Sequence, residues 1–486
     1  MSNTATILDP RHYVNVGPNG SFRASGSLHT SPEDIRALFA ELRTTDTDRM
    51  VVHFHGGLVG EDQGLAGAVQ LLQDYYAASR AHPVFFLWET GAIETLLRNL
   101  RDIHDTELFR RLIALLAKKL AKYVGVSVGA KGVGQEPDDA DIASELAKER
   151  PFEDLDTAAA TGARGGAALP ERQLAQQLEH EIDIELSADP ELRRMLHDRD
   201  QGAERLREGL AEPAAPGAKG IISTAAAAAA LARVLARCIG RWMQRRDHGF
   251  YPTLMEEAVR ELYLDDFGAW MWGNMKSVAE QMWLPNGPEL GPDSHPGRLF
   301  LDELAALQRE RPDFKVDLVG HSAGSIAICH LLEANAARNI GVRIRNVIFL
   351  APAVRSDLFH NAVVQAPERC RRLRIFTMQD AREREDNLVP FVYTRSLLYL
   401  ISGVLEPDQA DCPILGMERF LSGKAPYDDK LLVAVADCLK APGADRLVLS
   451  DTDDAAPPGL RSAAIKHGGF AQDRATMLSV RSLIDA

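Results

Sequence analysis

The stretch VDLVGHSAGSIAICHLL, residues 316–332, is the strongest indication of the fold in this sequence. It begins with a short apolar run, continues through the pentapeptide GHSAG at 320–324, and ends in residues with high helix propensity. An apolar strand, a tight turn bounded by glycines and a helix together make one unit of a parallel β–α fold. The same unit is therefore expected on both sides of this stretch.

Further strands are predicted by apolar runs bounded by turn residues. They cover residues 12–16, 50–54, 83–88, 344–352, 373–378 and 446–450. Helical stretches lie between several of them, at 64–80, 298–311 and 323–336. Continuous rather than alternating apolar runs are typical of strands that are covered on both faces. The sequence thus predicts an α/β protein with a doubly wound, mostly parallel sheet.

Three segments are expected. Residues 1–45 hold a short strand and a helix that begins near Ser31, where a proline and two acidic residues follow a capping serine. Residues 46–90 and 296–486 form the sheet-bearing core. Residues 91–295 are dominated by helix formers and are interpreted as a helical insertion that serves as a cap or lid. The tryptophans of this insertion, Trp270, Trp272 and Trp283, are expected to pack between helices.

Composition excludes several classes of protein. Of the 486 residues, 69 are acidic and 55 are basic, for a net charge of −14. Such a surface repels nucleic-acid phosphates, so no nucleic-acid partner is expected. The most apolar long stretch, 221–239, contains Arg233 and Arg237 and is too costly to insert as a membrane span. Peripheral contact with a membrane is compatible with the sequence.

The five cysteines are scattered and show no CxxC spacing, which excludes a disulfide framework or zinc site as the basis of the fold. The first residues, MSNTATILDPRHYVNVG, lack the basic and apolar regions of a signal peptide. We therefore expect a cytoplasmic protein.

Ser322 lies at the centre of GHSAG, where a sharp turn exposes a side chain at the carboxyl edge of the sheet. A serine in this position is a candidate nucleophile for acyl transfer. An oxyanion formed during that reaction needs two backbone amides. One is expected from Ala323, which follows the nucleophile. The other is expected from the turn after the strand at 50–54, where Gly56 and Gly57 leave the backbone accessible.

A nucleophilic serine needs a histidine base, and the usual order after such a turn is serine, acid, histidine. Three histidines follow Ser322 in the chain. His330 lies within the next helix, and His360 precedes the strand after which the acid is expected. His467 lies in a glycine-flanked loop, KHGGF, after the last strand and is the predicted base.

The acid has three candidates. Asp380 follows the strand at 373–378 by two residues and is preferred, because residues at a strand end are held rigidly. Asp386 is the second choice, and Asp357, after the preceding strand, is the third.

Together these features resemble the α/β-hydrolase superfamily, on its lipase and esterase side. The features are GHSAG between strand and helix, HGG after an earlier strand, an acid after a later strand and a late histidine. The resemblance covers about residues 46–90 and 296–486. It implies a serine hydrolase that cleaves a carboxylic ester or lipid acyl bond through a Ser-His-Asp triad, without a metal or organic cofactor. The insertion enters earlier than lids commonly do, so the resemblance implies no particular substrate.

Other interpretations stay open. A peptidase or amidase could use the same triad, and an α/β-hydrolase-like module could bind a partner without catalysis. His53 and His55 could also be paired ligands of a metal-dependent hydrolase, since alternate strand residues project to one side. We prefer His53 as a core histidine, because that site lacks further ligands and leaves GHSAG unexplained. The basic cluster Arg371, Arg372 and Arg374 is expected to be a solvated edge.

Overall fold

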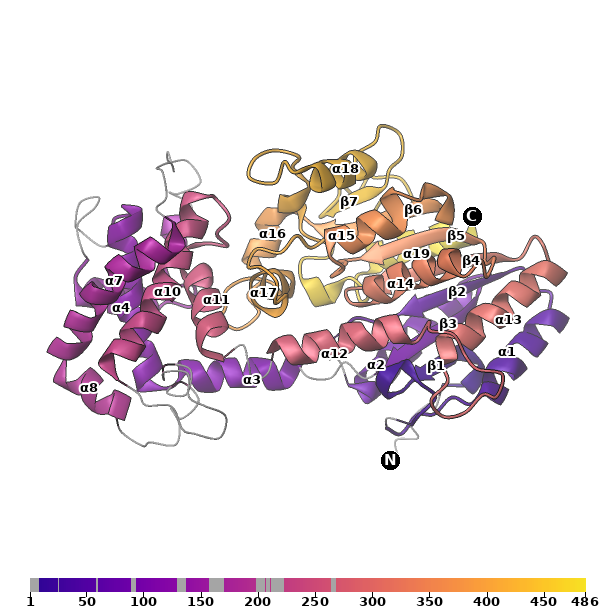
Figure 1. Cartoon of the computed structure of the whole chain (residues 1–486). Helices are drawn as coiled ribbons and strands as arrows, with labels where there is room; N and C mark the ends of the chain where they lie inside the picture. Colours follow the sequence, from indigo (N-terminus) through magenta and orange to yellow (C-terminus); the bar gives the residue numbers. More distant parts are fainter. Residues whose placement is uncertain are drawn as a thin grey trace, which may run out of the picture. The chain divides into compact units, whose positions relative to one another are not determined.

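The computed structural model describes residues 8–24, 26–57, 60–88, 93–128, 137–156, 170–197, 206, 210, 223–263 and 268–486. These residues form two compact units. The first comprises Met1–Glu94, Met271–Glu383 and Pro413–Ala486, and the second comprises Thr95–Trp270 and Arg384–Cys412. Helices and strands of both units are labelled in Figure 1.

The first unit is built on a seven-stranded sheet with the order β1-β3-β2-β4-β5-β6-β7, in which every pair of neighbours is parallel. The strands are β1 (Tyr13–Val16), β2 (Arg49–Phe54), β3 (His82–Trp88), β4 (Lys315–His321), β5 (Ile344–Leu350), β6 (Cys370–Met378) and β7 (Leu447–Ser450). The predicted fold class is confirmed. The strand expected near the N-terminus is β1, and it forms one edge of this same sheet.

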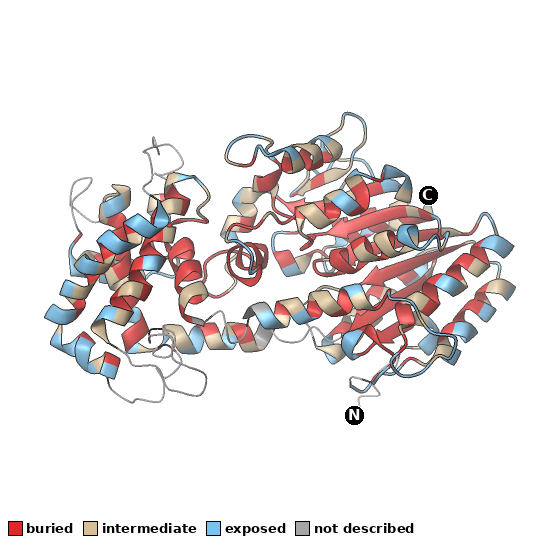
Figure 2. Ribbon diagram, in the orientation of Figure 1, coloured by how far each residue is buried: buried red, intermediate tan, exposed pale blue. Residues whose placement is uncertain are grey.

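The helices of the first unit cover both faces of the sheet. They include α1 (Pro32–Thr44), α2 (Glu61–Asp74), α12 (Gly268–Gln281), α13 (Pro296–Glu310), α14 (Gly324–Ala337), α15 (Ser356–Phe359), α16 (Asp380–Glu385), α18 (Lys430–Leu439) and α19 (Arg474–Asp485). Residues of α2 and α19 pack on one face, in a core with Phe85, Val319 and Phe376. The helices α1 and α13 pack together, and the ring of Phe300 contacts those of Phe39 and Phe86. Figure 2 shows the strands buried between these layers.

Local sequence explains why α1 begins where it does. Ser31 accepts a hydrogen bond from the amide of Asp34, and the Asp34 carboxylate accepts one from the amide of Ser31. This reciprocal pair satisfies backbone donors that have no partner inside the helix, and Pro32 occupies the first helical position.

The second unit is helical. Its helices are α4 (Glu107–Val124), α5 (Asp139–Leu146), α7 (Glu171–Ala188), α8 (Pro190–His197), α10 (Thr224–Met243), α11 (Phe250–Tyr263) and α17 (Leu397–Leu400), with α3 (Ile93–His104) at its start. The alanine-rich α10 packs against α4, α7 and α11. Among the described residues, no helix is both long enough and apolar enough to cross a membrane. A cavity of about 1330 Å³ within this unit is lined by residues of α4, α5, α8 and 390–392.

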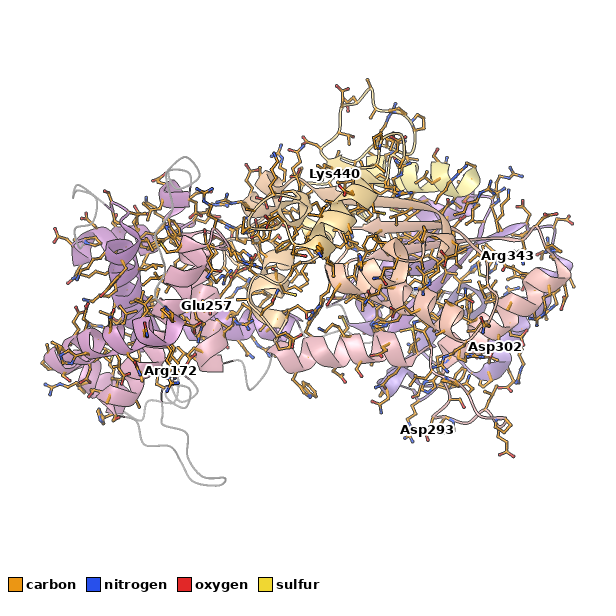
Figure 3. All side chains as sticks on the ribbon, turned by 45° about the horizontal axis from the view of Figure 1, so that its top comes forward. Arg172, Glu257, Asp293, Asp302, Arg343 and Lys440 are labelled. Atoms are coloured by element: carbon orange, nitrogen blue, oxygen red, sulfur yellow. The ribbon has the colours of Figure 1, made fainter. Side chains whose placement is uncertain are left out.

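Buried charges hold the two chain segments of the second unit together. Glu257 on α11, labelled in Figure 3, pairs with Arg237 and Arg241 of α10. His248 lies between two carboxylates, 2.7 Å from Glu256 and 3.0 Å from Asp411. Asp411 belongs to the segment Arg384–Cys412, so this cluster joins that segment to α11. The sequence predicted a helical insertion at 91–295 but did not indicate that residues 384–412 also belong to the helical unit.

Candidate active site

The backbone at Ser322 is strained. Ser322 lies between β4 and α14 and has a φ of 48°, a left-handed conformation that costs energy for any residue with a Cβ. Its amide donates a hydrogen bond to the Leu350 carbonyl at 2.9 Å, and its carbonyl accepts one from the Ala353 amide at 3.1 Å. Leu350 is the last residue of β5 and Ala353 lies three residues beyond it, so the neighbouring strand and the turn after it hold the serine in this conformation.

The two glycines of GHSAG are required by close packing. A Cβ on Gly324 would overlap the carbonyl group of Phe54 at the end of β2. A Cβ on Gly320 would lie 2.9 Å from backbone atoms of Gly324. Real Cβ atoms do not approach backbone this closely, so only glycine lets α14 start directly against β2 and β4.

His467 lies beside the serine hydroxyl. Its Nε2 is 3.0 Å from Oγ of Ser322, although the two residues are 145 positions apart. His467 begins a short 3₁₀ turn, His467–Gly469, in the loop that follows β7. Its side chain is buried, and burial lowers its pKa to about 3, with a smaller contribution from His321. A neutral imidazole in this position can accept the serine proton.

His321 supports the loop that carries His467. Its Nε2 lies 3.2 Å from the carbonyl oxygen of His467, and the two rings stack with centroids 5.9 Å apart. Burial lowers the pKa of His321 as well, so its ring is neutral. In the sequence His321 is the second residue of GHSAG and has no predicted role, because its contact depends on a loop far along the chain.

The HGG turn after β2 lies against the nucleophile. A Cβ on Gly56 would be 3.2 Å from Nδ1 of His321 and 3.6 Å from the Ser322 Cβ. A Cβ on Gly57 would be 2.7 Å from the Ala323 Cβ and 2.8 Å from Sδ of Met275. The backbone of this turn therefore comes as close to the serine as it can only because it carries no side chains.

The strand order brings the HGG turn after β2 and the GHSAG turn after β4 to neighbouring positions at the same edge of the sheet. From β2 the chain moves to β3 on one side, whereas from β4 it continues to β5 on the other, and β2 and β4 are neighbours. Ligands in open parallel sheets bind outside the carboxyl ends of strands at such a switch point. Gly56 and Gly57 follow β2, and Ser322 follows β4.

The three candidate acids occupy different surroundings. Asp380 begins α16 directly after β6, and its amide donates a hydrogen bond to Glu418 at 2.8 Å. Asp357 is paired with Arg355. Burial raises the pKa of Asp357, but the hydrogen bond and charge of Arg355 together with backbone hydrogen bonds outweigh burial, and the net pKa is lowered. Asp386 belongs to the second unit. Asp380 as the triad acid stays a prediction.

The histidines of β2 and its turn have partners within the fold. His53 is buried, with Nδ1 2.9 Å from the Tyr76 hydroxyl, as expected for a core histidine. Nδ1 of His55 lies 2.6 Å from the Gly56 carbonyl, and Nε2 accepts a hydrogen bond from the Trp88 amide. Burial lowers the pKa to about 3 for His53 and to about 4 for His55. No cluster of potential metal ligands occurs among the described residues.

Two of the three tryptophans pack in the interior. Trp283 is buried against Phe54 and Phe86, and its Nε1 donates a hydrogen bond to the Ala327 carbonyl at 3.1 Å. Trp272 is also buried, whereas Trp270 is 69% exposed. Trp283 thus connects the segment after α12 to α14, the helix that follows the nucleophile.

The comparison with protein families agrees with this geometry. Residues 299–384, which run from α13 through β4, Ser322 and β6, match a family described as an alpha/beta hydrolase of unknown function. The resemblance to the α/β-hydrolase superfamily is confirmed. Neither the comparison with curated proteins nor that with solved structures finds a match to this chain. The α/β-hydrolase assignment covers the fold and leaves the substrate open.

Proposed function

We propose that this α/β hydrolase is a serine hydrolase that cleaves a carboxylic ester or a lipid acyl bond. The observation that carries the proposal is the 3.0 Å separation of Ser322 Oγ and His467 Nε2 at a strained turn. A hydroxyl within hydrogen-bond distance of a neutral imidazole is the arrangement that nucleophilic catalysis needs.

In the first half-reaction, the Ser322 oxygen attacks the substrate carbonyl carbon while its proton passes to Nε2 of His467. The amides of Ala323 and Gly57, with Gly56 beside them, stabilise the oxyanion of the tetrahedral intermediate. The imidazolium then returns the proton to the leaving alcohol, and the carbon–oxygen bond breaks to leave an acyl-serine.

In the second half-reaction, His467 takes a proton from water, whose oxygen attacks the acyl carbon. The imidazolium then returns this proton to Oγ of Ser322 as the acyl–serine bond breaks, and the carboxylic acid is released. Asp380 orients the imidazole and stabilises its charged form. Asp380 is preferred over Asp386 because it belongs to the same compact unit as Ser322 and His467. This chemistry requires no metal or organic cofactor.

The helical unit is proposed to act as a cap that shapes the acyl pocket and limits water. Support comes from connectivity, because its two segments leave the sheet after the carboxyl ends of β3 and β6. Loops at that edge carry the site in open α/β folds.

The scattered cysteines support a cytoplasmic location.

Labelling with a fluorophosphonate probe tests the nucleophile on the full-length chain. We expect the wild type to be labelled, Ser322→Ala to lose the label and His467→Gln to be labelled at least 100-fold more slowly. Exposed Ser422 offers a matched control, and Ser422→Ala should be labelled like the wild type. Label retained by Ser322→Ala, or absent from the wild type, contradicts the proposal.

The peptidase or amidase alternative shares every one of these groups. Turnover of p-nitrophenyl butyrate and of the matching anilide separates the two, because the amide requires protonation of a poorer leaving group. We expect the ester to be hydrolysed and the anilide to be hydrolysed at least 100-fold more slowly. Comparable rates would favour the amidase.

A further inference from the structure

A second cavity lies at the amino ends of β5, β6 and β7. Its volume is about 330 Å³, and its charged lining consists of Arg371, Arg372, Arg374 and Arg446. The rest of the lining is apolar apart from Asn346 and two cysteines, and it includes neither aspartate nor glutamate. Four arginines therefore contribute to the lining of one small cavity, Arg371 and Arg372 with exposed side chains, in a protein whose net charge is −14.

Arg374 is the most informative of the four. The side chain is half-buried, and its Nε and Nη1 are shielded from water without a hydrogen-bond partner in the described part of the chain. Guanidinium nitrogens are obligate donors, and buried donors are nearly always satisfied. Burial lowers the pKa of Arg374, against the opposing effect of Asp445, and Arg372 lowers it further. An arginine remains charged in a protein, and no carboxylate of the described residues lies within ion-pair distance of Arg374.

The surroundings do little to neutralise the cluster. None of the four arginines forms an ion pair with a described residue. Nη1 of Arg446 donates a hydrogen bond to the Cys438 carbonyl at 2.9 Å, which leaves its charge uncompensated. Burial raises the pKa of the Cys370 thiol to about 11, so that thiol is neutral and supplies no negative charge.

This cavity is distinct from the candidate active site. Asn346, in its lining, pairs with Asp317 of β4, five positions before Ser322. At about 3.3 Å per strand residue, about 16 Å of strand separates that level of the sheet from the serine. Arg343, labelled in Figure 3, precedes β5 and marks the same amino edge.

We propose that this cavity binds the phosphate group of a small phosphate monoester. A planar guanidinium presents paired N–H donors that match phosphate oxygens, and a dianion would compensate the cluster. The volume of about 330 Å³ falls at the lower end of small-molecule sites, about 300–1,000 Å³, so it holds more than the phosphate alone. The apolar residues of the lining would contact the organic part of the ligand.

Binding of phenyl phosphate and of inorganic phosphate to the full-length chain, measured by isothermal titration calorimetry, tests this proposal. We expect phenyl phosphate to bind more tightly than inorganic phosphate, and Arg374→Gln to weaken binding of both at least tenfold. Arg374→Lys keeps the charge but loses the paired donors, and should weaken binding by a smaller factor. Exposed Arg338 lies outside the cavity, and Arg338→Gln should bind like the wild type.

A lipid headgroup could supply the same phosphate. Flotation with phosphatidylcholine vesicles, with and without phosphatidic acid, distinguishes this source: phosphatidate-dependent binding lost in Arg374→Gln would assign a headgroup. Far-UV circular dichroism and the melting midpoint establish that each variant is folded. The proposal is overturned if the wild type binds none of these probes, or if folded Arg374→Gln binds them as the wild type does.

Discussion

Acidification should destabilise the sheet-bearing unit through His53. This side chain is fully buried on β2, and burial, with smaller contributions from His321 and His55, lowers its pKa from 6.5 to about 3. The folded protein therefore keeps His53 neutral at pH values where the unfolded chain binds a proton. Because the unfolded state gains protons first, stability is present above pH 6.5 and is lost as the pH falls toward 3.

The size of the effect follows from the two pKa values. At pH 5.5 the unfolded chain is mostly protonated at this position and the folded chain is not. The difference lowers the free energy of unfolding by about 1.4 kcal/mol relative to pH 7.5. His467 and His55 also have pKa values lowered by burial, so the wild type should lose more than this single contribution.

The variant His53→Gln isolates one residue, because glutamine can still bond to the Tyr76 hydroxyl but does not titrate. Urea unfolding is followed by tryptophan fluorescence at pH 7.5 and 5.5. The stability difference between wild type and variant should shrink by about 1.4 kcal/mol at the lower pH. The buried neighbour Val52 provides the control, since Val52→Ala should cost the same at both pH values. A difference for His53→Gln that does not change with pH would refute this reasoning.

Three further predictions concern the nucleophile turn and the core. Gly57→Ala places a new Cβ 2.7 Å from the Cβ of Ala323 and should slow fluorophosphonate labelling about 100-fold. Gly60→Ala is the control: its Cβ would enter open space, so the labelling rate should not change. The free energy of unfolding of Ser322→Gly should be about 1 kcal/mol higher than that of Ser322→Ala, because glycine adopts a φ of 48° without steric strain. Equal melting midpoints for the two variants would show that the turn is not strained. Arg345→Met leaves the Asp317 carboxylate buried without its ion pair and should lower the free energy of unfolding, measured in urea, by about 3–5 kcal/mol. Adding Asp317→Leu to this variant should restore most of the lost stability.

Much of the fold could be predicted because its signals are local. The apolar runs of β2 through β7, the capping serine of α1 and the glycines of GHSAG each act within a few residues of where they stand. Ser322 was singled out in the same way, by a strand on one side and a helix on the other.

The candidate site required more than local signals. His467 was chosen by its order in the chain and its glycine-flanked loop, and its role as the base stays a prediction. The hydrogen bond between His321 and the His467 carbonyl could not be predicted, because no motif in the sequence marks that pair and only the folded loop brings the two groups together. The solvated edge expected for Arg374 also differs from the structure, in which part of its guanidinium is buried.

The sequence by itself determined the alternation of strands and helices in the sheet-bearing core and the tight turn at Ser322, and it predicted a helix-rich insertion at 91–295. Only the tertiary structure decided that residues 384–412 belong with those helices, through the buried pair of Arg395 with Asp156 and the bonds from His248 and Arg246 to Asp411. Propensity and turn chemistry depend on neighbours in the chain, whereas a buried charge needs a partner in space, and its distance along the sequence is unconstrained.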